Sequence, residues 1–76
     1  MNYKQLQILK VLASQTHHGK WAYLPSQIAI LTSLSDGEVL SLLSGMEQDH
    51  LIYHENHRGT RYYFISGSGL TILHHS

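Results

Sequence analysis

The chain contains 76 residues, of which 42% are hydrophobic, with no cysteine and a formal net charge of zero at pH 7. This length predicts one small domain, 1–76, whose single core is just large enough to be stable, and the apolar content excludes intrinsic disorder. The lack of cysteine excludes disulfides and cysteine-built zinc sites. No apolar run approaches the roughly 20 residues of a membrane span and no signal peptide is recognisable, so we expect a cytoplasmic protein without a membrane partner.

The charged residues are segregated along the chain, although their sum is zero. Residues 1–34 carry three lysines and no acid, a charge of +3. Residues 35–49 carry four acids and no base, and residues 50–76 carry two arginines and one glutamate. The centre of the chain is therefore acidic, whereas nucleic-acid-binding domains usually show a basic footprint.

The first half of the chain predicts two helices and a short strand. Apolar residues in 2–14 recur at three- and four-residue spacing, which is typical of an amphipathic helix. Residues 21–24 are mostly aromatic and apolar and predict one brief strand. A second helix is expected over 25–32, because Pro25 suits the first helical position, where its missing N–H would have no intrahelical partner. The residues expected on the buried side of this helix are Ile28, Ala29 and Leu31.

A third helix is predicted over 35–49, close behind the second. Ser35 and Glu38 have the spacing of a capping box, in which each side chain accepts a hydrogen bond from the backbone N–H of the other residue. Only three or four residues join the two helices, which is typical of a helix-turn-helix. The residues expected on the buried face of the third helix are Val39, Leu42, Leu43 and Met46.

After His50 the hydrophobic period changes to two. Two runs rich in aromatic and β-branched residues flank the letters HRG and predict a hairpin over 51–65 with a glycine in its turn. A last short helix is expected over 68–74, capped by Ser66 or Ser68. The hairpin residues expected on the inward face are Leu51, Tyr63 and Ile65, with Phe64 or Ile52 on the other face.

The order helix, short strand, helix, turn, helix, hairpin, short helix is that of the winged helix-turn-helix, an α+β fold whose hairpin is called the wing. PSQIA at 25–29 is similar to the start of that family's second helix, and LSDGEVLSLLSGMEQDHLI at 34–52 resembles its recognition helix. YFISGSGL at 63–70 is similar to the exit from the wing in bacterial regulators of the multiple-antibiotic-resistance type. The resemblance covers residues 3–74 and rests on hydrophobic spacing. It implies a small transcriptional regulator that binds duplex DNA.

The resemblance implies DNA contacts from the wing and from the third helix. Arg58 and Arg61 lie near the predicted tip of the wing, with His57 beside them, where arginines reach phosphates or a narrow minor groove. The alternative is a solubilising tip that protects a strand edge from pairing. The other residues expected to contact DNA are Ser41, Ser44 and Gln48 on the outward face of the third helix, and Lys20 in the loop before the strand.

The third helix also departs from the family's pattern. Where such helices usually offer hydroxyl, amide or basic side chains, this chain has Glu38, Leu40 and Ser41. Acidic groups are repelled by the phosphate lattice, whose contacts with lysine and arginine normally supply most of the affinity. The alternative function is a protein-interaction module that docks its acidic third helix on a basic partner. The residues expected at that interface are Asp36, Glu38, Leu40 and Glu47.

Metal binding and catalysis have little support in the sequence. On a strand, His50 and His54 would lie about 13 Å apart, too far to share a metal ion, so solvated side chains explain them better. The serines sit where caps and turns explain them, and no nucleophile, phosphate loop or carboxylate pair stands out. We therefore expect no cofactor and no enzyme activity. A homodimer is expected from the resemblance and the small core, through the first helix or the segment 70–76.

Overall fold

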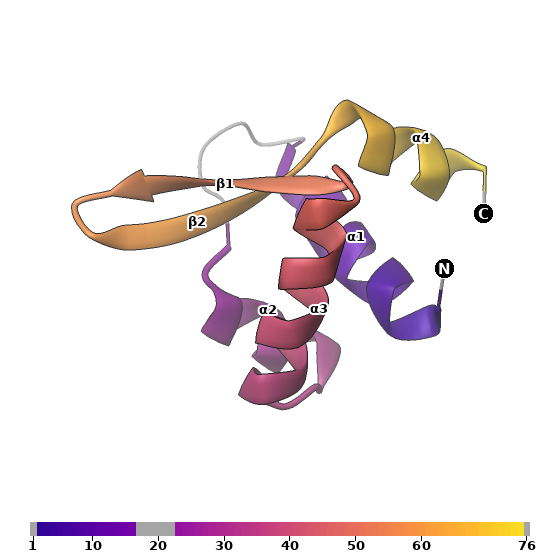
Figure 1. Ribbon diagram of the computed structural model, residues 1–76. Helices are drawn as coiled ribbons and strands as arrows, with labels where there is room; N and C mark the ends of the chain where they lie inside the picture. The colour runs from indigo at the N-terminus through magenta and orange to yellow at the C-terminus, as the bar shows by residue number, and fades with distance from the viewer. Residues whose placement is uncertain (1, 17–22, 76) are drawn as a thin grey trace.

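The computed structural model describes residues 2–16 and 23–75, which form four helices and one two-stranded antiparallel sheet (Figure 1). The elements follow in the order α1 (Tyr3–Thr16), α2 (Pro25–Thr32), α3 (Asp36–Gln48), β1 (Ile52–His57), β2 (Thr60–Ile65) and α4 (Gly67–His74). α1 and α3 both pack on α2, the β1–β2 hairpin extends away from the end of α3, and α4 returns beside α1 (Figure 1). The winged helix-turn-helix expected from the sequence is confirmed.

A turn of three residues joins α2 to α3 and bends the pair by 111°. Ser33 adopts a left-handed φ of 60° and ends α2 with a Schellman-type pair of backbone hydrogen bonds. Ser35 then begins α3, because its hydroxyl accepts from the backbone N–H of Glu38 at 3.1 Å. Only this half of the predicted capping box forms, since the Glu38 carboxylate pairs with Lys4 instead.

Among the described residues no single helix is long and apolar enough to cross a membrane, and α2 with α3 reaches that length and composition only as a strongly bent pair.

α3 ends in a second Schellman motif, centred on His50. The φ of His50 is 61°, and its N–H donates to the carbonyl of Glu47 at 3.0 Å. The N–H of Leu51 donates to the carbonyl of Met46, also at 3.0 Å. The chain thereby reverses direction within two residues, which buries Leu51 and lets β1 begin against the end of the helix.

The wing is a tight hairpin whose turn contains two residues. β1 and β2 pair with Ile52 opposite Ile65, and the register continues to the turn without a bulge. Arg58 and Gly59 form the turn with φ values of 52° and 78°. Positive φ at both central positions is the type I′ geometry, which matches the right-handed twist of the strands.

The strand predicted over 21–24 falls partly outside the described residues, which resume at Tyr23. The N–H of Tyr63 in β2 donates to the carbonyl of Tyr23 at 3.2 Å, an isolated antiparallel bridge. The segment before α2 therefore reaches the free edge of β2 and ties the wing to the helix-turn-helix.

The core lies between the first three helices and the inner face of the wing. Its buried side chains are Ile8, Leu9, Leu12, Ile28, Ala29, Val39, Leu43, Met46, Leu51, Ile52, Tyr63 and Ile65. Partly buried side chains packed around it are Val11, Ala13, Tyr23, Leu34, Leu42, Leu70 and Leu73.

One expectation about the core was wrong, and one alternative is resolved. Leu31, expected on the buried side of α2, is 55% exposed. The inward direction of this helix lies between Ile28 and Ala29, so the next turn presents Thr32 to the core instead. Ile52 lies in the core because it pairs with Ile65 on the inner face of the sheet, which leaves Phe64 as the residue on the outer face.

α4 is attached to the end of α3 through Ser66 and Gly69. The Ser66 hydroxyl donates to the carbonyl of His50 at 2.6 Å and accepts from the N–H of Gly69 at 3.0 Å, so Ser66 rather than Ser68 is the cap. A Cβ atom at Gly69 would lie 2.2 Å from the carbonyl oxygen of Leu51. Only glycine permits this approach, and it fixes where α4 lies relative to the wing.

Candidate nucleic-acid interface

α3 presents one strip of small and polar side chains to solvent. Positions 37, 41, 44 and 48 share a face because they are three or four residues apart, and all four are exposed. A Cβ atom at Gly37 would meet nothing within 4 Å, so the surface there is open. Another molecule can therefore approach the helix backbone closely. The strip consists of Gly37, Ser41, Ser44 and Gln48, and Leu40 lies beside it.

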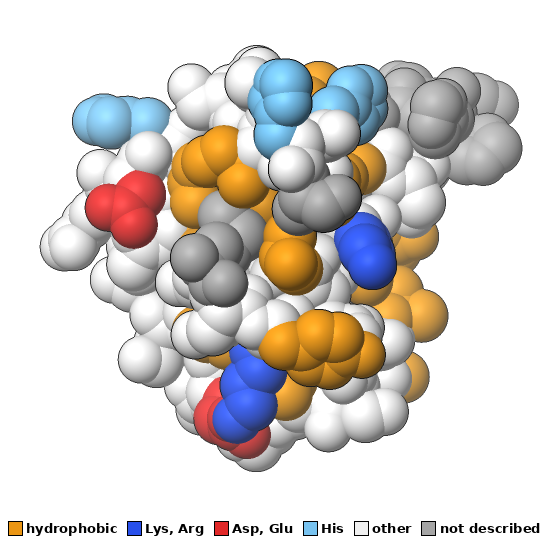
Figure 2. All heavy atoms as spheres, turned by 90° about the vertical axis from the view of Figure 1, so that its right-hand side faces the viewer, with side chains coloured by type: hydrophobic (Ala, Val, Ile, Leu, Met, Phe, Trp, Pro, Cys, Tyr) orange, Lys and Arg blue, Asp and Glu red, His pale blue; other side chains and the backbone are white. Residues whose placement is uncertain are grey.

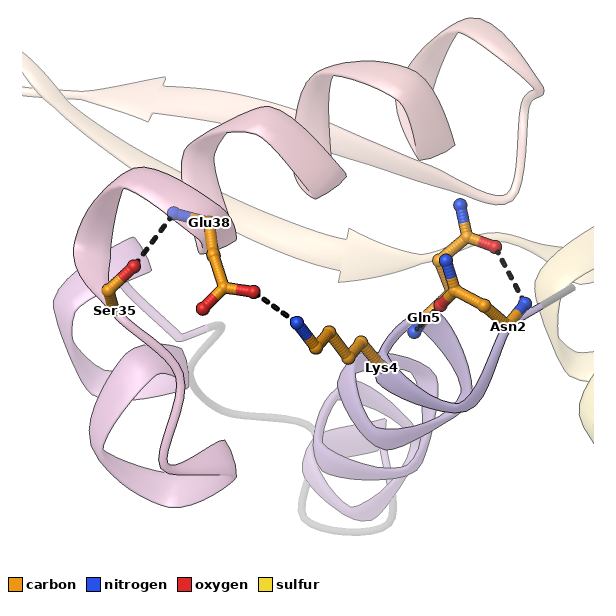
Figure 3. Close-up of polar contacts among 5 residues, drawn as sticks. All are labelled: Asn2, Lys4, Gln5, Ser35 and Glu38. Atoms are coloured by element: carbon orange, nitrogen blue, oxygen red, sulfur yellow. Dashed lines mark hydrogen bonds and ion pairs between the residues drawn. The ribbon is translucent and has the colours of Figure 1, made fainter.

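Glu38 points away from this strip, toward α1. Its carboxylate accepts from the ammonium group of Lys4, so the ion pair bridges α3 and α1 (Figure 3). The hydrogen bond from Lys4, followed by its charge, lowers the pKa of Glu38 from the ordinary value of 4.5. The pair neutralises one of the acids that the sequence places in the third helix.

A second cluster connects the far end of α3 to the inner face of the wing. His54 Nδ1 of β1 lies 2.5 Å from a carboxylate oxygen of Glu47 in α3. Arg61 faces the same cluster: a hydrogen bond and charge interaction with Tyr63, and then the charge of Glu47, raise the pKa of its guanidinium group. Glu47 is therefore engaged by wing residues rather than presented freely to solvent.

The tip of the wing carries an exposed cation. Arg58 occupies the first position of the two-residue turn and is exposed. The turn geometry requires a left-handed conformation, which arginine adopts less readily than glycine or asparagine. Its side chain belongs to neither face of the sheet, so the guanidinium group extends from the end of the hairpin.

The outer face of the wing is aromatic. Tyr53 and Phe64 stack across the two strands, with ring centroids 5.1 Å apart. His57 meets Tyr62 edge to face and lies 3.3 Å from a carboxylate oxygen of Glu55. These contacts stabilise the hairpin as cross-strand pairs and place the His57 ring on the outer face, next to the turn.

The structure brings together part of the predicted DNA-contact set. Ser41, Ser44 and Gln48 share the outward strip of α3, whereas Arg58 lies at the far end of the wing. Arg61 is two residues from the turn and faces the cluster around Glu47. Lys20 lies outside the described residues.

Three functional neighbours were missed by the sequence predictions. Lys4 pairs with Glu38 across 34 positions of sequence, and His54 pairs with Glu47 across seven. Tyr63 was expected only as a core residue, yet it is also the partner of Arg61. The position of His54 in its strand could have predicted this contact. His54 follows Ile52 by two residues, so its side chain lies on the same face of the strand and points toward α3.

No group of three or more histidine or acidic side chains in residues 2–16 and 23–75 is arranged to hold a metal ion. The paired histidines at 17 and 18 lie outside these residues.

The fold and this surface define a winged helix-turn-helix domain with the architecture of the MarR-type transcriptional regulators. The chain is similar in structure to MepR, described as a transcription regulator of the Staphylococcus aureus multidrug efflux pump MepA, with a TM-score of 0.86 and 20% identity. That match covers 99% of this chain and 54% of MepR. A MepR–DNA complex matches with a TM-score of 0.83 and 19% identity, over 99% of this chain and 53% of MepR.

Two further solved structures show the same likeness. Bordetella bronchiseptica BpsR, whose DNA binding is described as regulated by 6-hydroxynicotinic acid, matches with a TM-score of 0.87 and 13% identity over 99% of this chain and 52% of its own. A MarR-family regulator from Silicibacter pomeroyi matches with a TM-score of 0.84 and 13% identity over 99% of this chain and 49% of its own. The chain thus spans about half the length of these structures. No protein-family model and no curated protein sequence matches it.

Proposed function

We propose that this chain is a duplex-DNA-binding domain of a transcriptional regulator, with the outward strip of α3 in the major groove and the wing tip on the neighbouring backbone. The observation that supports this most directly is the geometry of the two exposed features. The six residues of β1 place Arg58 roughly 17–20 Å beyond the end of α3. Half a turn of B-DNA spans about 17 Å. When α3 lies in the major groove of a duplex, the wing tip is therefore about as far away as the neighbouring backbone or minor groove.

The internal ion pairs make this role compatible with an acidic third helix. Lys4 neutralises Glu38, and His54 and Arg61 face Glu47. The strip that meets the groove is then hydroxyl, amide and glycine, which hydrogen-bond to bases or phosphates without repelling them. Few cations remain to contact phosphate, so we expect weak binding with a shallow salt dependence.

The test is fluorescence anisotropy of a labelled random duplex, beginning at low salt and stepping upward. We expect log K to fall by about 0.9 for each phosphate contact per unit of log salt concentration. Arg58→Asn removes the tip cation while supplying a residue that type I′ turns favour, so the wing stays folded. The slope of log K against log salt concentration for this variant should correspond to about one phosphate contact fewer.

Two comparisons show whether the wing is responsible. Arg61→Ala should have a smaller effect than Arg58→Asn, because Arg61 lies on the inner face of β2, two residues from the turn, whereas Arg58 is at the tip of the wing. Lys10→Ala, which removes an exposed cation on α1, should leave the slope unchanged. A folded protein that shows no binding at low salt would contradict the proposal, and equal losses in all three variants would contradict the role of the wing.

A homodimer is part of the proposal. Apolar side chains gather on the side of the molecule where α1 begins and α4 ends (Figures 1 and 2), and Tyr3 on α1 is 71% exposed. Burying such a face against a second copy would add to a small core. Sedimentation of the protein used for the anisotropy titration, over a range of concentrations, measures whether this dimer forms.

A further inference from the structure

The helix-turn-helix carries exposed apolar side chains that neither the core nor the proposed DNA contacts account for. Ile30 is 77% exposed and Leu31 is 55% exposed in the last turn of α2, and Leu40 is 53% exposed early in α3. All three flank the turn at 33–35, and the strip beside Leu40 is made of small residues. We call Ile30, Leu31 and Leu40 the apolar turn patch.

The charge around this patch has one sign. Residues 21–49 contain four acids and no lysine or arginine. Of these acids, Glu38 is paired with Lys4 and Glu47 is engaged by His54. Asp36 is exposed in the first turn of α3 and forms no ion pair with any residue that the structure describes. Asp36 therefore borders the patch and carries a negative charge that can pair with a cation of another molecule.

We infer that the apolar turn patch is a docking surface for a basic amphipathic helix of a partner protein. A helix with leucine-like residues on one face and lysine or arginine beside them matches both features of the patch, its exposed apolar groups and its uncompensated negative charge. The open surface at Gly37 and the small Ser41 allow the backbone of such a helix to come close to α3. The interface that the sequence predicts for a basic partner is thereby changed: Leu40 and Asp36 remain, Ile30 and Leu31 join them, and Glu38 and Glu47 are used inside the chain.

A partner helix on the apolar turn patch would also affect DNA binding, and this consequence rests on the proposed function. Ser41 is adjacent to Leu40, and Ser44 lies one helical turn further along the same strip. A helix seated on Leu40 would cover the groups assigned to the major groove. Duplex DNA and the partner helix would therefore exclude one another, and the partner would act by displacing DNA.

The closing experiment uses a synthetic 14-residue helix with leucine on one face and lysine on the other, titrated into the full ¹⁵N-labelled chain and followed by amide chemical shifts. Two control peptides have the same length, one with glutamate for every lysine and one with serine for every leucine. We expect saturable shifts around Ile30, Leu31 and Leu40 with the first peptide only. Leu40→Ser should weaken the binding at least tenfold, and Asp36→Asn should weaken it severalfold.

Ile72→Ser is the matched control, since Ile72 is an exposed apolar residue on α4, 38% exposed and outside the patch. It should bind the peptide as the unaltered chain does, and thermal melts of all three variants should coincide with that of the parent because the side chains are exposed. Shifts confined to α1, α4 or the wing, equal binding by Leu40→Ser, or binding of the glutamate peptide would overturn the inference. Self-association of the free chain that Leu40→Ser abolishes would also overturn it, in favour of a second copy as the occupant.

The dependence on DNA is measured separately, by adding the lysine peptide to a preformed complex with labelled duplex. A cationic peptide can also displace the protein by binding the duplex itself. Displacement by the lysine–leucine peptide but not by the equally charged lysine–serine peptide therefore supports mutual exclusion, and equal displacement by both peptides contradicts it. Direct peptide binding without any duplex binding would leave the docking surface intact and overturn the proposed function alone.

Discussion

The Glu38 carboxylate illustrates how one side chain takes on a role that its sequence position does not reveal. Its place in an acidic helix suggests a surface presented to a basic partner, and its spacing from Ser35 suggests a cap. In the folded chain it turns toward α1 and pairs with Lys4, so it connects two helices instead (Figure 3). The ion pair removes a negative charge from the neighbourhood of the outward strip of α3.

The lowered pKa of Glu38 makes stability depend on pH in a defined direction. A carboxyl group with a folded-state pKa below its unfolded value of about 4.5 stabilises the fold above that value, and this contribution disappears as pH falls through the folded-state pKa. Glu38→Gln should therefore have a lower Tm than the parent chain at pH 7, and the two should converge below pH 4. Thermal melts monitored by circular dichroism across this range measure the difference.

Varying the salt concentration provides a control for the Glu38→Gln prediction. Because both side chains are exposed, high salt should screen the pair and reduce the pH 7 difference in Tm. A Tm difference that persists unchanged at pH 3 would show that the glutamine acts through packing rather than through charge.

Within residues 2–16 and 23–75, three residues other than glycine adopt positive φ angles, and each marks a junction. Ser33 ends α2, His50 ends α3, and Arg58 opens the turn of the wing. A side chain in this conformation costs roughly 1–2 kcal/mol, which the flanking hydrogen bonds and packing offset. Because Ser33 and His50 are not glycine, the sequence signals of the two helix ends were weak, whereas Gly59 beside Arg58 marked the turn of the wing.

Among the elements, α4 depends on a close approach of its backbone to the start of the wing. A Cβ atom at Gly69 would lie 2.2 Å from the Leu51 carbonyl oxygen and 2.8 Å from Ile65 Cγ1. Gly69→Ala must therefore push α4 away from the start of the wing, and we expect it to lower the free energy of unfolding by about 1–3 kcal/mol. Urea denaturation measures this change.

The matched control for that prediction is Gly67→Ala, two residues earlier in the same helix. A Cβ atom there would meet nothing within 4 Å, so the substitution should leave stability within about 0.5 kcal/mol of the parent. Equal losses at positions 67 and 69 would contradict the role of the contact with Leu51, because helix propensity alone favours alanine over glycine.

At the level of the whole chain, the core is small and every helix depends on it. A domain of this length has a total stability of about 4–11 kcal/mol. Leu43 is fully buried in α3, so Leu43→Ala should cost about 2–5 kcal/mol and leave the domain near the limit of folding. The loss should appear as one transition in both circular dichroism and aromatic fluorescence, because α1, α2, α3 and the wing share that core.

Leu31→Ala tests the same leucine-to-alanine change on the surface. Leu31 is exposed on α2, so we expect a change within about 0.5 kcal/mol. Comparable losses at 31 and 43 would contradict the burial described for α2, and would also remove Leu31 from the apolar turn patch.

Hydrophobic spacing along the chain was sufficient to predict the architecture. The three- and four-residue spacing in α1 and α3, the proline that opens α2, and the change to a period of two after His50 are local features that tertiary contacts did not override. The outward positions of Ser41, Ser44 and Gln48 follow from the same spacing, since the residues between them are the buried ones. The predicted position of Arg58 near the turn likewise follows from the glycine beside it.

The partners of the charged side chains were decided only by the tertiary structure. Lys4 and Glu38 meet because α1 and α3 both pack on α2, and Glu47 meets His54 because the chain reverses at His50 and lays β1 along the end of α3. Such pairs join residues that are distant in sequence or lie across a reversal, and no local pattern encodes them. The surface of the third helix is consequently less acidic than its sequence, because Lys4 of α1 neutralises Glu38.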